Sequence, residues 1–238
     1  MILVAATAYN EIKYIKHFVD FYRKQGCELL VLDNYSTDGT YEWLLENNVK
    51  TGRVDTEGTF HLGKLQAALV NYINRIHPSW LVYCGIDLFY YFENGIEQEI
   101  QKAKEHKCSI IEVAHLDGYN TGEVFQMPFQ DNYFYVKVCP RPLQMIARWH
   151  PRFKFAGDRI HLTYGGKVYK SSGFVINYGM CKSREEREET YQRRIKAWEI
   201  GELKGHGTHY KPASERQWIW NKEELIDIRE TRFYDLMR

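Results

Sequence analysis

The sequence carries almost no net charge and contains no long apolar run. Its 32 Lys and Arg residues balance 31 Asp and Glu residues, so the formal charge is +1. A protein that wraps a phosphate backbone needs an excess of basic residues, so we expect no nucleic-acid partner. No stretch approaches the roughly 18 apolar residues of a membrane-spanning helix. We therefore expect no membrane span either.

Paired cysteines are also missing. The five cysteines are odd in number and widely spaced, and no Cys-x-x-Cys motif occurs. This pattern favours reduced, mostly buried cysteines in a reducing compartment, with a disulfide between two of them as the alternative. The apolar start Met1–Ala6 has no basic leader before it, which disfavours a signal peptide. We accordingly expect a cytoplasmic location.

The two common nucleotide-binding signatures are absent or incomplete. Gly-x-Gly-x-x-Gly does not occur. Gly58 to Lys64 fits the first seven positions of a phosphate-binding P-loop, but Leu65 stands where a Ser or Thr would hold Mg²⁺. Large side chains within the segment, such as Phe60, also disfavour a close approach of phosphate to the backbone. We interpret the segment as a loop that begins a helix.

The order of apolar segments indicates the fold class. In the first half, short apolar runs alternate with stretches of helical periodicity, which is typical of an α/β domain. The expected strands are 2–6, 29–32, 49–55, 80–84 and 108–114; the expected helices begin near 10 and 40 and cover 62–76 and 94–106. The pattern predicts a mainly parallel central sheet flanked by helices.

Beyond residue 115 the pattern changes. Strands are expected at 133–138, 143–149 and 168–178, with no helices between them. A charge-rich helix follows at 183–200, whose charges we interpret as a solvated face with i,i+4 pairs. A last helix is expected at 222–236. We predict one domain over residues 1–180, with residues 181–238 forming a helical extension packed on it.

Polar and acidic residues gather where three predicted strands end. Thr7, Tyr9 and Glu11 follow the first strand, Asp33 follows the second, and Asp87 follows the fourth. Ligands of open α/β sheets bind at the carboxyl ends of the strands. The sequence therefore places a ligand site at this edge of the sheet.

Several motifs resemble family 2-like glycosyltransferases of the GT-A fold. Asp33–Thr40 reproduces every fixed position of the family's Asp-Asn-x-Ser-x-Asp-Gly-Thr segment, and Tyr9-Asn-Glu is similar to its first-strand motif. Gly63-Lys-x-Gln also resembles the family, as do two weaker segments, 150–161 and 175–179. The resemblance covers about residues 2–180. It implies a nucleotide-binding half over 1–115 and an acceptor-binding half over 116–180.

The resemblance also implies roles in binding a nucleotide-sugar donor. Thr7, Tyr9 and Glu11 would line the nucleoside slot, where Tyr9 offers a flat apolar face to the base. Asp33 would accept a hydrogen bond from the base. Lys64 would neutralise the diphosphate.

The expected metal site departs from the family pattern. Family members carry Asp-x-Asp after the fourth strand, but this chain has Gly85-Ile-Asp87. Asp87 would still hold Mn²⁺ or Mg²⁺, hard cations that prefer oxygen ligands. The family's His-Tyr-Gly segment begins with Asn177 here, so His161 is expected to compensate as a ligand. These changes predict weak metal affinity without the nucleotide.

An inverting transfer also needs a general base to remove the proton of the acceptor hydroxyl. Leu162 stands where the family branch has Glu, so Asp158 is the first candidate and Asp117 the second. A glycan or another hydroxyl compound would be the acceptor. Aromatic residues of the second half would hold it: Tyr119, Phe125, Phe129, Tyr133, Phe134, Tyr135 and Trp149.

The sequence thus favours a metal-dependent, inverting glycosyltransferase. Two alternatives fit the same residues. The altered positions Gly85, Leu162 and Asn177 are also what an inactive sugar- or nucleotide-binding protein on the same fold would show. A nucleotidyltransferase is the less favoured alternative, because its strand-end acids are similar.

Overall fold

The computed structural model describes residues 1–59, 61–119, 135–140, 142–156, 159–161, 166–199 and 225–237. The helices are α1 (Ile12–Lys24), α2 (Thr40–Glu46), α3 (Leu62–Ile76), α4 (Gly95–Glu105), α5 (Arg184–Glu199) and α6 (Tyr234–Met237). The first strands are β1 (Ile2–Ala8), β2 (Glu28–Asp33), β3 (Lys50–Arg53), β4 (Trp80–Tyr83), β5 (Leu88–Tyr91) and β6 (Ile110–Tyr119). The later strands are β7 (Tyr135–Val138), β8 (Leu143–Arg148), β9 (Lys154–Ala156), β10 (Arg159–His161), β11 (Val168–Asn177) and β12 (Ile226–Asp227).

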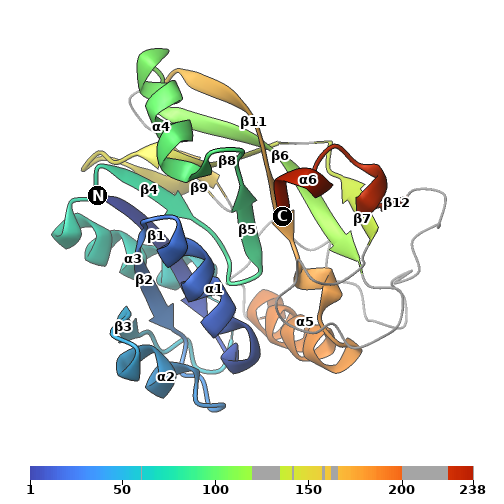
Figure 1. The fold of residues 1–238 in the computed structure, drawn as a ribbon. Helices are drawn as coiled ribbons and strands as arrows, with labels where there is room; N and C mark the ends of the chain where they lie inside the picture. The colour runs from blue at the N-terminus through green and yellow to red at the C-terminus, as the bar shows by residue number, and fades with distance from the viewer. Residues whose placement is uncertain are drawn as a thin grey trace.

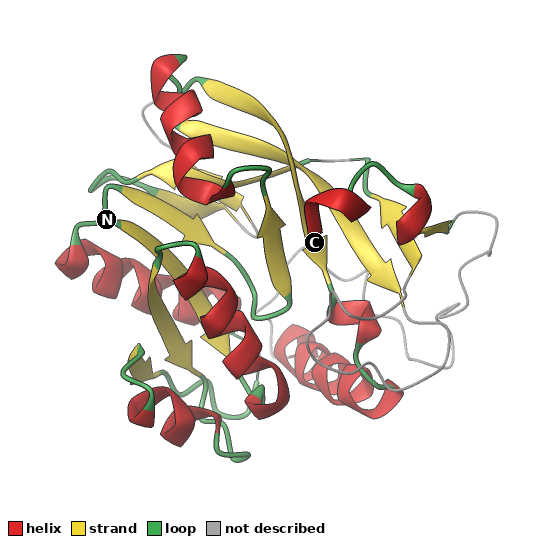
Figure 2. Ribbon diagram, viewed as in Figure 1, coloured by secondary structure: helices red, strands yellow, loops and turns green. Residues whose placement is uncertain are grey.

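The first half is the α/β unit that the sequence predicts. β4, β1, β2 and β3 lie side by side in this order and are all parallel. Their apolar runs are buried because helices lie on both faces of the sheet, as Figures 1 and 2 show. α1 buries one stripe at helical spacing: Tyr14, Ile15, Phe18, Val19 and Tyr22. The parallel arrangement brings the carboxyl ends of β1, β2 and β4 to one edge.

The second half makes the sheet mixed. β8 pairs antiparallel with β4 and with β6, and β7 pairs antiparallel with β6. β11 runs parallel to β6 and antiparallel to β5. The full order is β12-β7-β6-β8-β4-β1-β2-β3; β11 attaches to β6, and β5 attaches to β11. The α/β class is confirmed, whereas parallel pairing dominates only in the first half.

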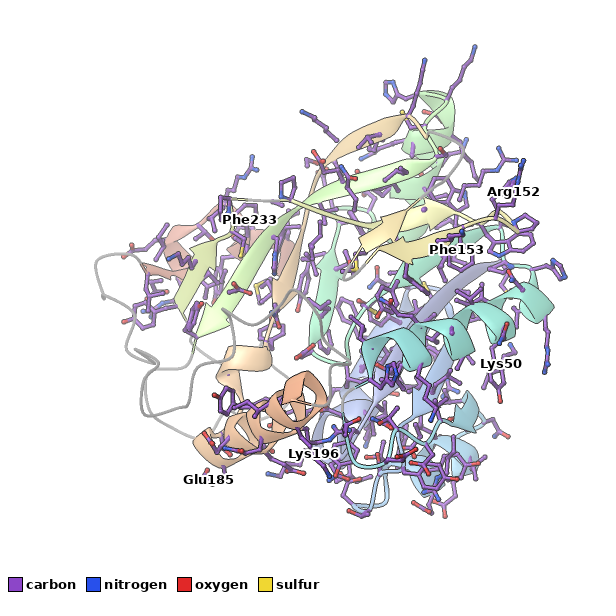
Figure 3. All side chains as sticks on the ribbon, turned by 180° about the vertical axis from the view of Figure 1, so that it is seen from behind. Lys50, Arg152, Phe153, Glu185, Lys196 and Phe233 are labelled. Atoms are coloured by element: carbon purple, nitrogen blue, oxygen red, sulfur yellow. The ribbon has the colours of Figure 1, made fainter. Side chains whose placement is uncertain are left out.

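Three elements differ from the sequence expectation. β5 directly follows Asp87 and was not expected as a separate strand; it pairs with β11, far along the chain. The short hairpin of β9 and β10 was not expected. In place of a helix at 222–236, the described residues form β12, a 3₁₀ turn (Ile228–Glu230) and the short α6. There Phe233, labelled in Figure 3, packs its ring 4.7 Å from that of Phe174 on β11.

The expectations about the cysteines, about membrane-spanning helices and about the loop before α3 can be compared with the structure. All five cysteines are free, as the sequence predicts. Among the described helices, none has the length and apolar character needed to cross a bilayer. Among the described residues of the 58–64 segment, Gly58 and Thr59 lie in a turn and a bend, and α3 begins at Leu62, which agrees with the expected loop before a helix.

Candidate functional site

The ends of β1 and β2 form one continuous surface. Ala8 pairs with Asp33, and the Asn34 N–H donates to the Ala8 carbonyl (2.8 Å). Tyr9 follows directly and is half-buried, and Thr7, also half-buried, pairs with Leu32. Thr7, Tyr9 and Asp33 therefore lie at one edge of the sheet, as the sequence predicts.

The motif after β2 shapes the loop after β1. The Asn10 N–H donates to Ser36 Oγ (2.9 Å), and the Ile12 N–H donates to Asp38 Oδ2 (3.0 Å). The Glu11 N–H donates to Thr40 Oγ1 (2.9 Å). Ser36, Asp38 and Thr40 thus satisfy the backbone donors that precede α1. Their role in this chain is to fix the positions of Tyr9 and Glu11.

Asp33 is the motif residue whose carboxylate is incompletely satisfied. Its side chain is fully buried, and Oδ2 accepts bonds from the Ser36 N–H (3.0 Å) and from Arg53 Nε (3.3 Å). Oδ1 is buried and has no hydrogen-bond partner in the described part of the chain. Because an unsatisfied buried acceptor costs free energy, Oδ1 is suited to accept a bond from a ligand N–H.

Tyr9 is covered by a residue that the sequence did not single out. The guanidinium carbon of Arg193 on α5 lies 3.2 Å from the centre of the Tyr9 ring. Arg193 Nη2 also donates to the Thr59 carbonyl (3.0 Å). The guanidinium therefore occupies the ring face that was expected to receive a base.

Two acidic side chains of α5 also bond to residues at the start of α1 and in the loop before it. Glu186 accepts bonds from Lys13 (2.9 Å) and from the Tyr14 hydroxyl (2.9 Å), and Glu189 accepts a bond from Asn10 (3.2 Å). In Figure 3 the Lys196 end of α5 lies beside the first half of the chain, whereas Glu185 lies at the opposite end of the helix. Glu185 and Glu189 are exposed, as expected for a solvated face, whereas Glu186 is half-buried against α1.

The hollow left under α5 is small. Its volume is about 30 Å³, and it is lined by Tyr9, Asn10, Glu11, Tyr14, Lys182, Glu186, Glu189 and Thr190. Sites for small ligands typically measure about 300–1,000 Å³. A nucleoside therefore enters this slot only after α5 or the Arg193 side chain moves away.

Glu11 and Asp87, both predicted site residues, come together around a buried lysine. Lys182 Nζ donates to both carboxylate oxygens of Glu11 (2.6 and 2.8 Å). Burial raises the pKa of Glu11 from 4.5 to about 7; Lys182 opposes this rise and the charge of Asp87 adds to it. Burial lowers the pKa of Lys182, but the negative charges of Glu11 and Asp87 outweigh it, and the pKa is raised. Lys182 is therefore a cation held between two carboxylates.

The surroundings of Asp87 fit a hard cation in part. The carboxylates of Asp87 and Glu11 are oxygen donors of the kind that Mg²⁺ and Mn²⁺ prefer, and Lys182 shows that a positive charge is stabilised there. Asn177 is committed elsewhere, because its Oδ1 accepts the Gly179 N–H (3.0 Å). The backbone of His161 lies on β10, but its side chain is outside the described part of the structure.

Glycines make room for the Asp87 carboxylate. A Cβ atom at Gly85 would lie 2.6 Å from Asp87 Oδ1, and one at Gly179 would lie 2.8 Å from Asp87 Oδ2. Contacts under 3.0 Å would force the carboxylate to rotate. The absence of a side chain at Gly85 and Gly179 thus leaves room for the Asp87 carboxylate in its observed position.

Two predicted residues do not join the cluster. Lys64 is exposed in the first turn of α3, and no hydrogen bond or ion pair links its side chain to the described residues Glu11, Asp33 or Asp87. Asp158 lies outside the described residues, so its role as the base stays a prediction. The same holds for Phe125, Phe129, Tyr133 and Phe134. Of the other aromatics, Tyr119 is buried, whereas Tyr135 is exposed.

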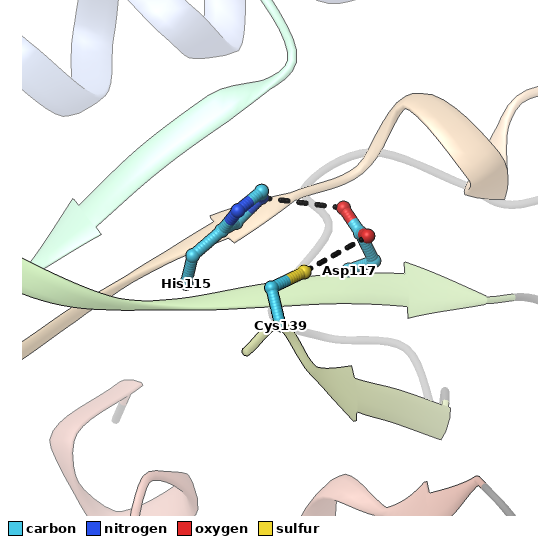
Figure 4. Close-up of side chains that lie close together, drawn as sticks. All are labelled: His115, Asp117 and Cys139. Carbon is cyan, nitrogen blue, oxygen red and sulfur yellow. Dashed lines mark hydrogen bonds and ion pairs between the residues drawn. The ribbon is translucent and has the colours of Figure 1, made fainter. Parts of the chain in front are cut away.

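A second polar cluster surrounds Asp117 at the end of β6 (Figure 4). Asp117 Oδ2 accepts a bond from the Cys139 thiol (3.0 Å), and His115 Nε2 lies 3.3 Å from Asp117 Oδ1. Asn177 Nδ2 donates to the same Oδ1 (3.1 Å). Burial disfavours the charged carboxylate, but His115 and Cys139 outweigh burial and lower the pKa of Asp117. With both oxygens engaged and a low pKa, Asp117 is poorly suited to act as a general base.

Comparisons with known proteins were made in sequence and in structure. No protein-family model and no curated protein matches the chain. The crystal structure of S. aureus TarS 1–349 is similar, with a TM-score of 0.48 and 15% identity over 88% of this chain and 68% of that one. TarS 1–349 in complex with UDP-GlcNAc gives a TM-score of 0.45 at 15% identity, covering 88% of this chain and 69% of that one.

Glucosyl-3-phosphoglycerate synthase (GpgS) from Mycobacterium tuberculosis, in complex with phosphoglyceric acid, is a more distant match. Its TM-score is 0.33 at 17% identity, covering 55% of this chain and 48% of that one. Since these TM-scores lie below 0.5 and the identities below 25%, the matches assign no activity to this chain.

Proposed function

We propose that this chain transfers a sugar from a nucleotide-diphosphate sugar to a hydroxyl acceptor, with inversion at the anomeric carbon. The observation that carries the proposal is the unsatisfied, buried Oδ1 of Asp33, at the carboxyl end of β2 and beside the Tyr9 segment. A base N–H would satisfy it, while Arg53 holds Oδ2 and fixes the orientation of the carboxylate.

In this proposal residues 1–115 bind the donor and residues 116–180 bind the acceptor. Thr7, Tyr9 and Glu11 line the nucleoside slot, and Lys64 meets the diphosphate. Residues 181–238 form an extension that packs on the same domain, and α5 opens when the donor binds. The five free cysteines support a reducing location such as the cytoplasm.

A divalent cation, Mg²⁺ or Mn²⁺, belongs to the proposal at Asp87, with His161 as a further ligand. When bound, such an ion stabilises the charge that develops on the leaving diphosphate. Asp87 and Glu11 provide the negative charge that attracts it, and Lys182 neutralises that charge when the donor is absent. Asp158 is the proposed base, because the carboxylate of Asp117 is already engaged.

The test is a thermal-shift and calorimetric screen of UDP- and GDP-sugars with and without Mn²⁺. A ligand that binds only the folded state raises the melting temperature. Asp33→Asn should weaken binding of the selected nucleotide by about 10- to 100-fold. The amide NH₂ of Asn then replaces the Oδ1 acceptor, so that two hydrogen-bond donors face each other at the nucleobase. Asp20→Asn, an exposed change on α1, should leave binding unaltered.

The product that the chain releases distinguishes a transferase from an inactive binding protein and from a nucleotidyltransferase. Release of the nucleoside diphosphate in the presence of acceptor supports the transferase. Binding without turnover, unchanged by Asp158→Asn, would instead indicate an inactive binding protein. Release of pyrophosphate from a nucleoside triphosphate would indicate a nucleotidyltransferase.

A further inference from the structure

Three side chains with nitrogen, oxygen and sulfur donors meet at β6 and the end of β7. One ligand atom from each of His115, Asp117 and Cys139 lies within 4.8 Å of the others. We propose that these three residues bind one Zn²⁺ ion. The inference does not depend on the proposed transfer reaction, which gives none of the three a catalytic role.

The backbone holds the three donors rigidly. His115 and Asp117 are two residues apart on β6, so their side chains project from the same face of the strand. Cys139 directly follows β7, which pairs with β6, and its N–H donates to the His115 carbonyl (2.8 Å). The donors therefore sit on paired strands, which fix ligand geometry better than loops do.

The imidazole of His115 lacks a satisfactory partner. Its Nε2 atom is buried and makes no hydrogen bond of acceptable geometry within the described part of the chain. The nearest group is Asp117 Oδ1 at 3.3 Å. A buried ring nitrogen whose nearest polar group is a carboxylate oxygen 3.3 Å away is placed to act as a metal ligand together with that carboxylate.

The donor set selects the ion. Thiolate and imidazole ligands favour Zn²⁺, whereas Mg²⁺ and Mn²⁺ prefer oxygen ligands alone. Zn²⁺ bonds of about 2.0–2.3 Å in tetrahedral geometry put donor atoms about 3.3–3.8 Å apart. The observed separations are 3.0 Å from Cys139 Sγ to Asp117 Oδ2 and 3.3 Å from His115 Nε2 to Asp117 Oδ1, and the three ligand atoms lie within 4.8 Å of one another. Side-chain rotation would bring them to tetrahedral spacing.

Coordination also balances the charge. Without metal, the Cys139 thiol donates its hydrogen to Asp117 Oδ2. Zn²⁺ would replace this proton, and the thiolate and carboxylate would neutralise the ion. Three protein ligands leave a fourth position open for water or another ligand. Asn177 Nδ2 orients the carboxylate from the outer shell (3.1 Å).

The experiment uses the full chain stripped of metal with a chelator. Isothermal titration with Zn²⁺ should show one ion bound per chain, and Zn²⁺ should raise the melting temperature. Co²⁺, a spectroscopic substitute for Zn²⁺, should give a thiolate-to-metal charge-transfer absorption that Mg²⁺ cannot produce. Absence of both stoichiometric Zn²⁺ and this absorption in the wild-type chain would overturn the proposal without any variant.

Matched variants then locate the ion. Cys139→Ser should lower Zn²⁺ affinity by more than about 100-fold and abolish the Co²⁺ band, since even outer-shell partners are worth about 10–100-fold. Cys108→Ser alters another half-buried free cysteine and should change neither. Retained affinity in Cys139→Ser, or loss in Cys108→Ser, would refute this assignment. The Zn²⁺ titration is independent of the nucleotide-sugar screen, so the zinc site and the transferase activity can be refuted separately.

Discussion

The guanidinium of Arg193 stacks on the ring of Tyr9, with its central carbon 3.2 Å from the ring centre. The two residues come from opposite ends of the sequence, and together they close the slot at the end of β1. Arg193 thus covers the Tyr9 ring, on which the proposed function requires a nucleobase to stack. Under the proposed function, a nucleobase that stacks on this face of Tyr9 has to displace the guanidinium.

The first prediction concerns this stacking contact. Arg193→Ala should tighten binding of free nucleosides by about 2- to 30-fold, because the cation–π contact that a base must displace is worth about 0.5–2 kcal/mol. Calorimetry with uridine and guanosine measures the effect. Gln192→Ala, an exposed change on the same helix, is the control. Weaker binding in Arg193→Ala would mean that the guanidinium holds the nucleoside rather than competes with it.

The second prediction concerns the buried cation. Lys182→Met should lower the free energy of unfolding by about 3–5 kcal/mol, because it leaves the Glu11 carboxylate buried without a partner. Lys13→Met, which removes a largely exposed partner of Glu186, should cost no more than about 1 kcal/mol. Urea unfolding gives both values. Equal losses in the two variants would contradict the importance of Lys182 burial.

The third prediction concerns pH. The folded chain holds the Glu11 proton more tightly than the unfolded chain does, because burial raises the pKa from 4.5 to about 7. Between these values the folded state binds more protons, so Glu11 lowers stability as the pH rises. The penalty is absent below about pH 4.5 and complete above about pH 7. It amounts to about 3 kcal/mol, an order-of-magnitude conversion of the shift.

Glu11→Gln isolates this effect from the other titrating groups. The stability of the variant relative to the wild type should rise between pH 4.5 and 7 and then level off. Urea unfolding at a series of pH values measures the difference. A difference that is independent of pH in this range would show that Glu11 does not titrate there.

The fourth prediction concerns the glycine beside Asp87. Gly85→Ala should weaken Mn²⁺-dependent UDP binding by about 10- to 100-fold, because the new Cβ displaces the Asp87 carboxylate. Gly63→Ala, whose Cβ would lie 3.7 Å from the nearest His61 atom, is the matched control and should bind normally. Calorimetry with and without Mn²⁺ compares them. Normal binding in Gly85→Ala would remove the Asp87 carboxylate from the ion site.

Much of the fold followed from local pattern. The apolar runs of β1, β2 and β4 and the helical stripe of α1 were predictable, because each must bury its apolar face within one short segment. β5 was not, since its place in the sheet depends on pairing with β11, which is distant in the sequence. The antiparallel pairing of β8 with β4 was not predictable either, because strand order depends on contacts distant in the sequence.

The sequence by itself determined that Asp33 and its motif lie at the strand ends, because they belong to one local segment that must shape the loop after β1. Only the tertiary structure decided which distant groups lie beside them. Lys182 meets Glu11 across 171 residues, and Arg193 bonds to Thr59 across 134. No spacing rule links residues so far apart. Their meeting depends on where α5 packs, and the charges of that helix by themselves indicate only a solvated face.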